Sequence, residues 1–211
     1  MLEINLTADF YRFSAMMNDV ARKQMPFAIA MTLTTVAKAA QADVTADLPS
    51  IFDRPTPFTR HAIAMQPARK DALTATVFVK DVQARYLGVQ ETGGPQVLHG
   101  RALLQPKPGA PLNAYGNLSK GRTKALTSKP NVFVGWVKPA SGQPIWGFWQ
   151  RPKRGRAGSS NATLKLLIRG GDGTTVPQST LHFRDRVRRS VNATIGAAWD
   201  KTMAKVLATD R

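Results

Sequence analysis

The chain has 211 residues, of which 43% are apolar, enough to bury the core of one large domain. It contains no cysteine, which excludes disulfides, zinc–thiolate sites, iron–sulfur clusters and cysteine nucleophiles. Its formal net charge is +17, and no acidic residue occurs from Thr92 to Gly171, where thirteen residues are basic. Such a block repels itself, so we expect it to face a polyanion or an acidic protein surface. A solvated basic face and a compositional bias are the alternatives.

The N-terminal region shows no targeting or membrane-spanning pattern. Met1–Asn5 lacks the basic and apolar regions of a secretory signal. The longest uncharged run, between Lys23 and Lys38, has fourteen residues, whereas a membrane-spanning helix needs about twenty. We therefore expect no membrane partner.

Two helices are predicted within residues 1–50. Apolar residues from Phe10 to Val20 recur on one helical face, and Thr7 suits an N-cap. Pro26 is expected to end this helix and to begin a second, from Pro26 to Asp47. Its first half is apolar on all sides, so either it lies in the centre of the domain or a neighbouring subunit covers part of it. The candidate subunit-interface residues are Phe27, Ile29, Met31 and, from the last helix, Trp199.

Strands and a long arm are predicted in the middle of the chain. Two prolines predict an extended connector before a strand near Thr59–Met65, and Ala72–Lys80 alternates with β-type residues. Asp81–Tyr86 suits either a short helix or a turn. From Gly88 to Pro130, frequent prolines and glycines predict an extended arm, in which Leu98–Gln105 suits a short helix.

Hairpins and a long helix complete the prediction. Three strands are expected, the first two paired as a hairpin, at Asn131–Lys138, Ile145–Gln150 and Ala162–Arg169. A basic hairpin tip, Arg151–Ser160, precedes the third. The C-terminal helix is expected from Ser179–Phe183 to about Ala208. Its apolar residues recur every fourth position and so wind around the helix, beyond the reach of one flat surface.

This order of elements predicts an α+β fold over residues 1–211 as a single domain. A mainly antiparallel sheet is expected to pack against two N-terminal helices and the long C-terminal helix. The expected parts are a helical region 1–50, an extended arm 88–130, β-hairpins 131–170 and a helix 179–208.

No catalytic or metal-binding pattern is evident. His61, His99 and His182 lie far apart and lack metal-ligand spacing. The carboxylates are scattered, with only two glutamates in the chain. The glycines at 170, 171 and 173 lack the lysine and hydroxyl of a phosphate-binding loop and suit a turn. We therefore expect no enzyme, no metal and no cofactor.

The candidate binding residues are basic and aromatic. The residues expected to face DNA or an acidic partner are Lys120, Arg122, Lys124, Arg151, Lys153, Arg154 and Arg156. Four aromatic side chains either stack on bases beside the basic tip or fill the core, namely Trp136, Trp146, Phe148 and Trp149. The arginines between positions 184 and 189 either grip phosphates or form a solvated helix face.

Several segments together resemble a known family. They are the alanine-rich helical region, then Phe52–Thr59, Val77–Asp81, Tyr86–Gly88 with Gly93 and Gly94, and Asn113–Asn117. With the closing helix, these segments resemble tailed-bacteriophage minor tail protein Z and related tail-completion proteins over most of the chain. The basic block is not part of this resemblance.

The resemblance implies a structural protein of the virion tail or neck, assembled in the bacterial cytoplasm and without enzymatic activity. The implied partners are copies of itself in a ring and neighbouring phage tail and connector proteins. Double-stranded DNA in the ring lumen is a further expected partner of the basic face. The alternative is a stand-alone basic protein that binds nucleic acid as a monomer or dimer.

Overall fold

A computed structural model describes residues 2–7, 19–97, 103–139, 142–152, 163–171 and 173–208. Its helices and antiparallel sheets confirm the α+β class. The chain forms two compact units instead of the single domain expected. The helical unit comprises Met1–Gly93 and Gln178–Arg211, and the basic unit comprises Gly94–Pro177. The basic unit is thus an insertion between two parts of the helical unit.

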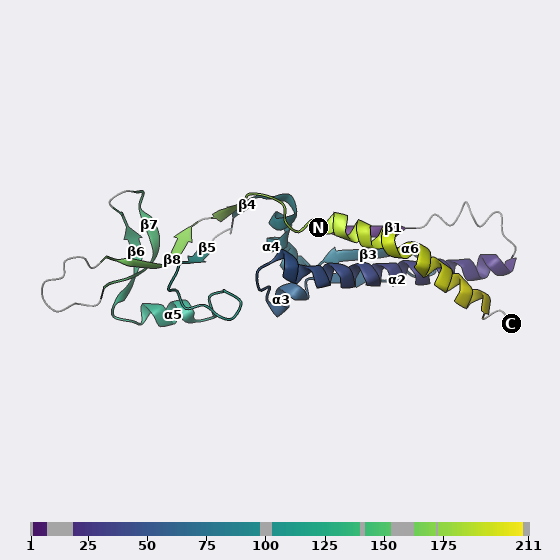
Figure 1. Cartoon of the computed structure of the whole chain (residues 1–211), viewed down its shortest axis with the longest axis horizontal. Helices are drawn as coiled ribbons and strands as arrows, with labels where there is room; N and C mark the ends of the chain where they lie inside the picture. The colour runs from purple at the N-terminus through teal and green to yellow at the C-terminus, as the bar shows by residue number, and fades with distance from the viewer. Residues whose placement is uncertain are drawn as a thin grey trace, which may run out of the picture. The chain divides into compact units, whose positions relative to one another are not determined.

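One long helix, α2 (Asp19–Ile51), runs through the helical unit and packs against β2, β3 and α6 (Figure 1). In its apolar half, Ala28, Ala30 and Leu33 are buried within the same chain, whereas Phe27 is 45% exposed. Pro26 lies inside this helix, and the predicted break there is wrong. An interior proline costs about 3 kcal/mol, whereas each large apolar side chain that is buried contributes about 1.5–3 kcal/mol. The helix expected at 10–20 lies mostly outside the described residues.

A three-stranded sheet covers α2, in the order β1 (Glu3–Thr7), β3 (Thr74–Val79), β2 (Ile63–Gln66), and both pairings are antiparallel. Strand β3 confirms the alternation predicted for residues 72–80, with every second side chain buried. Strand β1 was not expected. Thr7 lies opposite Thr74 at the end of this strand, and the turn that it was predicted to cap lies outside the described residues.

Two shorter helices flank this sheet. Helix α3 (Pro57–Arg60) begins after Thr56, whose hydroxyl accepts a hydrogen bond from the Thr59 N–H at 3.3 Å. The strand predicted from Thr59 therefore begins only at Ile63. Of the two alternatives for residues 81–86, the helix is correct, and it continues as α4 (Asp81–Thr92) into the region expected to be an extended arm.

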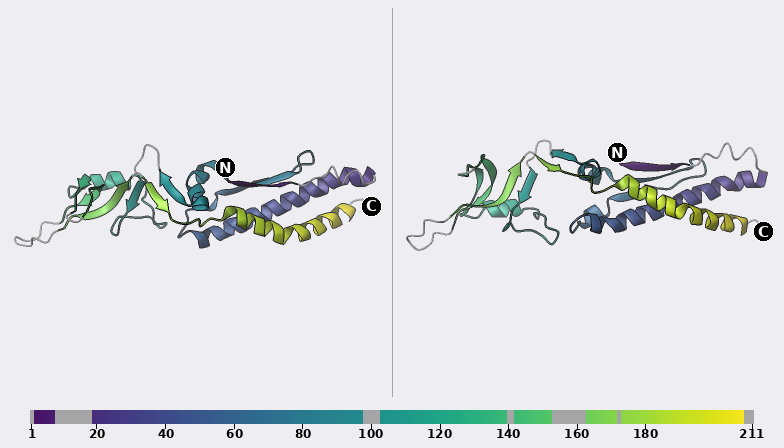
Figure 2. Two further views of the ribbon diagram at one scale, coloured as in Figure 1. Left: turned by 90° about the horizontal axis from the view of Figure 1, so that it is seen from above. Right: turned by 45° about the horizontal axis from the view of Figure 1, so that its top comes forward.

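The C-terminal helix α6 (Phe183–Ala208) has the predicted bounds and lies alongside α2 (Figure 2). The apolar residues wind around this helix as expected, so they are not all buried to the same degree. Phe183 and Val187 are fully buried, Trp199 is partly buried against the core, and Ile195 is 43% exposed.

The chain segments on either side of the basic unit are hydrogen-bonded to each other. The Gln90 carbonyl accepts bonds from the N–H groups of Thr180 and Leu181 at 2.8 and 3.0 Å. The Glu91 carboxylate accepts bonds from the N–H groups of Phe183 and Arg184, at 2.7 and 3.4 Å, and so caps α6. A carboxylate at a helix N-terminus satisfies free N–H groups and complements the helix dipole. These contacts hold the two ends of the insertion together.

The basic unit contains two antiparallel sheets. A two-stranded ribbon joins β4 (Gly94–Val97) to β9 (Gly173–Val176). The second sheet has the order β5 (Leu103–Pro106), β8 (Lys165–Gly171), β7 (Ile145–Gln150), β6 (Val132–Val137). The predicted hairpin of the last two strands is confirmed, with Val132 opposite Gln150 and Val137 opposite Ile145.

The region 88–130 is less extended than predicted. It contains the end of α4, both strands β4 and β5, and the helix α5 (Arg122–Thr127). Residues 103–105 form a strand instead of the predicted helix, and Gly170 and Gly171 belong to β8 instead of a turn. The partners of β4 and β5 lie more than 60 residues further along the chain, so no local pattern reveals them.

Candidate nucleic-acid interface

The charge asymmetry of the sequence coincides with the boundary between the two units. The basic unit carries thirteen lysines and arginines and one acidic residue, Asp172, a formal net charge of +12. The helical unit carries the remaining +5. The positive charge therefore belongs to a unit with its own sheet and core, in which Leu126, Phe148 and Ile168 are buried.

Helix α5 and the residue before its N-cap, Lys120, present three of the predicted cations. The helix follows Gly121, whose φ of 79° lies in the left-handed region that glycine adopts without strain. Leu126 is buried and anchors the helix beside β6. Lys120, Arg122 and Lys124 are all exposed.

Arg151 is exposed at the end of β7 and is held against β6. Its guanidinium carbon lies 5.0 Å from the centroid of the Phe133 ring, within the range of a cation–π contact. Its backbone N–H donates a hydrogen bond to the Asn131 carbonyl at 2.7 Å. The other predicted cations of the basic tip, Lys153, Arg154 and Arg156, lie outside the described residues.

The four aromatic residues proposed either for stacking or for the core divide between these roles. Phe148 and Trp149 are 6% and 5% exposed, and Trp146 is partly buried against the core. Trp136 is 71% exposed. The core alternative therefore holds for the residues of β7, and Trp136 on β6 is the one that remains open to a partner.

Trp146 is fixed by a close packing arrangement. Its ring lies edge-on to Phe148, with centroids 6.1 Å apart and an interplanar angle of 75°. A Cβ atom on Gly170 would lie 1.9 Å from the Trp146 ring, so only glycine leaves room for the indole there. The glycine that suited a turn thus serves the packing of this sheet.

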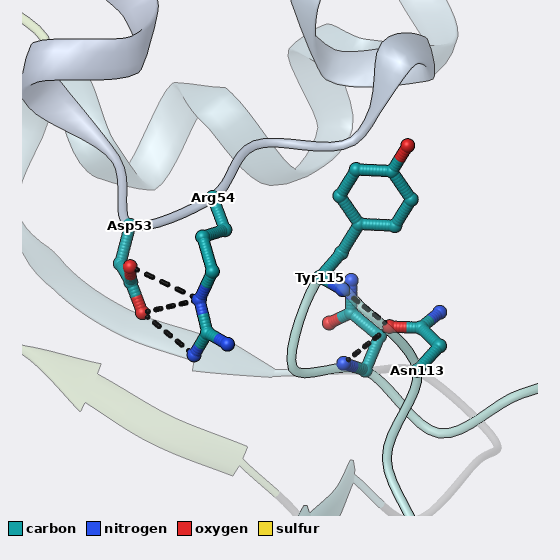
Figure 3. A network of polar contacts seen from close by, with 5 residues as sticks. Asp53, Arg54, Asn113 and Tyr115 are labelled. Atoms are coloured by element: carbon teal, nitrogen blue, oxygen red, sulfur yellow. Dashed lines mark hydrogen bonds and ion pairs between the residues drawn. The ribbon is translucent and has the colours of Figure 1, made fainter.

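An asparagine turn shapes the loop before α5 (Figure 3). Asn113 Oδ1 accepts hydrogen bonds from the N–H groups of Tyr115 and Asn117 at 2.9 and 3.0 Å. Such an Asx turn gives the segment a defined local conformation.

Figure 3 also shows the ion pair of Asp53 and Arg54 in the helical unit. The hydrogen bonds from Arg54 to the Asp53 carboxylate raise the pKa of Arg54 above its ordinary value.

Two arginines of α6, Arg186 and Arg188, form ion pairs, whereas Arg184 and Arg189 are exposed. Arg186 pairs with Asp47 of α2 at 2.5 Å and donates to the Leu181 carbonyl, and Arg188 lies 3.7 Å from Asp185. Ser190 donates to Asp43 at 2.5 Å in the same groove between α2 and α6. The Arg186–Asp47 and Ser190–Asp43 contacts join α6 to α2, so Arg186 is occupied within the chain.

The four predicted subunit-interface residues lie in different environments. Phe27 is 45% exposed, with the Lys70 Nζ atom 5.1 Å from its ring centroid. Met31 and Trp199 are partly buried. Ile29 belongs to the core of its own chain. It is therefore corrected from an interface residue to a core residue, because the neighbouring elements of the same chain cover it.

The described residues contain no group of three or more histidines, cysteines or carboxylates that could hold a metal ion. His61 follows α3 instead of lying on a strand, His182 precedes α6 with a φ of 46°, and His99 lies outside the described residues. Within the described ranges, no helix has the length and hydropathy required to cross a membrane.

The sequence pattern does not distinguish Trp136 from the other aromatic residues, and it does not single out Lys138 among the basic residues. The four aromatics share one hairpin, and the sequence does not state which strand lies at the edge of the sheet. Comparison with protein-family models, curated proteins and solved structures found no match to this chain.

Proposed function

We propose that this chain is a structural protein of a tailed bacteriophage virion. In this proposal it forms an oligomeric ring at the tail top or neck, completes the tail and mediates head–tail joining. The resemblance of the segments 52–59, 77–81 and 113–117 to tail-completion proteins supports the virion role. The chain acts without catalysis and without a cofactor.

The observation that carries the proposal is the concentration of positive charge in one inserted unit. A formal charge of +12 on Gly94–Pro177 opposes the close approach of several copies. A ring that places these units around double-stranded DNA, or against an acidic neighbouring ring, offsets this repulsion. Lysine and arginine contacts to phosphates are independent of sequence, as a connector that holds any genome requires.

The two units suggest a division of roles within such a ring. The helical unit supplies the larger core and the exposed Phe27 as a candidate contact between copies. The basic unit supplies Lys120, Arg122, Lys124 and Arg151 to the anionic partner. Rings arise when head-to-tail contacts of this kind close on themselves.

Genetics in a phage that encodes this chain tests the proposal. Deleting the gene should leave filled heads and tails that do not join, and mass spectrometry should find the chain in purified wild-type particles. Reversing charges at Arg122, Lys124 and Arg151 to glutamate should reduce joining or genome retention. Normal yields of infectious particles from either mutant would contradict the virion role.

The second candidate is a stand-alone basic nucleic-acid-binding protein, supported by the same charge and by the exposed Trp136. Light scattering and duplex binding at several salt concentrations distinguish the two candidates. A monomer or dimer that binds DNA tightly, with a steep salt dependence, favours the second. Higher-order assembly with weak binding by the isolated chain favours the virion protein.

A further inference from the structure

We infer that strand β6 of the basic unit carries a base-stacking site for single-stranded nucleic acid, centred on Trp136 with Lys138 beside it. The inference goes beyond the proposed function, which requires only phosphate contacts to a duplex. It concerns a ligand with unpaired bases and assigns a role to a side chain that the fold does not use.

Strand β6 is the last strand in the order β5-β8-β7-β6 and pairs with β7. Trp136 lies opposite Trp146 in that pairing, on the same face of the sheet. Trp136 is nevertheless 71% exposed, and Val134, two residues earlier on this face, is also exposed. A large aromatic surface left open in this way is typical of a binding site.

The packing of Trp146 explains why Trp136 is uncovered. Trp146 lies over Gly170 of β8 and edge-on to Phe148, which directs its ring away from β6. Among the described aromatic residues, Trp136 therefore has no stacking partner. A planar ligand can reach its indole without disturbing the core.

The charges around Trp136 select the ligand. Lys138 follows two residues later on the same face and is exposed. Beyond the other end of β6 lies the exposed side chain of Lys129. Arg151 packs against Phe133, whose side chain lies on the opposite face of β6 from that of Trp136. Every charged residue described in the basic unit is a cation. A second copy of this unit would be repelled, whereas an anionic strand is attracted along the whole edge.

Single-stranded nucleic acid supplies both features of this site in each of its residues, a phosphate for the cations and a base for the indole. Stacking on an aromatic side chain is independent of base identity, since every base has a π-face. An acidic peptide would satisfy the lysines and arginines but offers no planar group for Trp136. The geometry therefore favours unpaired nucleotides.

Fluorescence anisotropy of the full-length protein tests the inference. The probes are a labelled oligodeoxythymidine and a labelled duplex with the same number of phosphates. Trp136→Ala should weaken binding of the single strand about ten-fold, within the range that loss of one stacked base produces, and leave duplex binding within two-fold. Trp136→Phe should restore most of the single-strand affinity. Phe58→Ala removes an exposed aromatic residue of the helical unit and should change neither affinity.

A second readout addresses direct contact. Adding the oligodeoxythymidine should quench the tryptophan fluorescence of the wild type, and most of this quenching should be absent in Trp136→Phe. Unchanged single-strand affinity in Trp136→Ala would overturn the inference, as would an equal loss for single strand and duplex. A polyglutamate peptide that competes with the strand, and whose own binding also depends on Trp136, would overturn it in favour of a protein partner.

The test is independent of the proposed function. If Trp136→Ala leaves single-strand binding intact, the phosphate contacts of the basic unit and its role in a ring are unaffected. If the gene deletion gives normal particles, the stacking site can still be present in a free nucleic-acid-binding protein.

Discussion

The helical unit and the basic unit share one chain but distribute apolar and charged residues in opposite ways. In the described residues, the core of the helical unit comprises seventeen buried residues, which lie in α2, β2, β3, α4 and α6 or just before β2 and α6, whereas that of the basic unit comprises five. The basic unit has thirteen basic residues and one acidic residue, so its formal net charge is +12. Because hydrophobic burial dominates folding stability, the helical unit has the larger driving force, and the basic unit has the surface suited to a partner.

The largest expected effect comes from removing the basic unit altogether. Replacing residues 94–177 with a short glycine–serine linker should abolish binding to nucleic acid and leave the helical unit folded. The reason is that Gln90 and Glu91 already hold the flanking segments to Thr180 and Phe183. Circular dichroism should show retained helix and one cooperative unfolding transition. Loss of that transition would show that the helical unit depends on the insertion.

The second prediction concerns Phe183, which is fully buried in the helical unit. Phe183→Ala should lower the free energy of unfolding of this unit by about 3–5 kcal/mol, because it removes a large side chain and leaves a cavity. Urea titration monitored by circular dichroism measures the change. Ile195→Ala, at a 43% exposed position on the same helix, is the matched control and should have little effect. Similar losses in both variants would contradict the assigned core.

The third prediction concerns binding by α5. The double variant Arg122→Gln, Lys124→Gln removes two exposed cations and should flatten the dependence of log Kd on log salt by about two. Each cation neutralises one phosphate and releases its counterion. Anisotropy titrations with a duplex at several salt concentrations provide the slope. Lys38→Gln with Arg60→Gln removes two exposed cations of the helical unit and should leave the slope unchanged.

The smallest expected effect concerns the cap of α6. Glu91→Ala removes the acceptor of two helix N–H groups and should destabilise the helical unit by about 1–2 kcal/mol. Thermal unfolding of the full chain is the measurement. Asp53→Ala removes a carboxylate that is exposed in its ion pair with Arg54 and should leave the transition nearly unchanged. Equal shifts in the two variants would show that Glu91 acts only through net charge.

Local patterns predicted much of the fold. The period of two in Ala72–Lys80 predicted β3, because it reflects one buried face of a strand, and the spacing of four from Phe183 onward predicted α6, because it is close to the helical period. The prediction at Pro26 was wrong because tertiary packing of α2 outweighs the cost of one proline. Strand β1 was missed because the five residues Glu3–Thr7 carry too short a pattern.

The sequence predicted the positive charge of the candidate site but not the spatial arrangement of its residues. The sequence alone established the acid-free block, the absence of cysteine and the aromatic residues of the β6–β7 hairpin, because these are properties of composition and short spacing. Only the tertiary structure decided that the block forms a unit of its own and that β6 lies at the edge of its sheet. It also decided that Trp136 is exposed while Trp149 is buried. These properties depend on pairings between residues far apart in the chain, which a linear pattern does not contain.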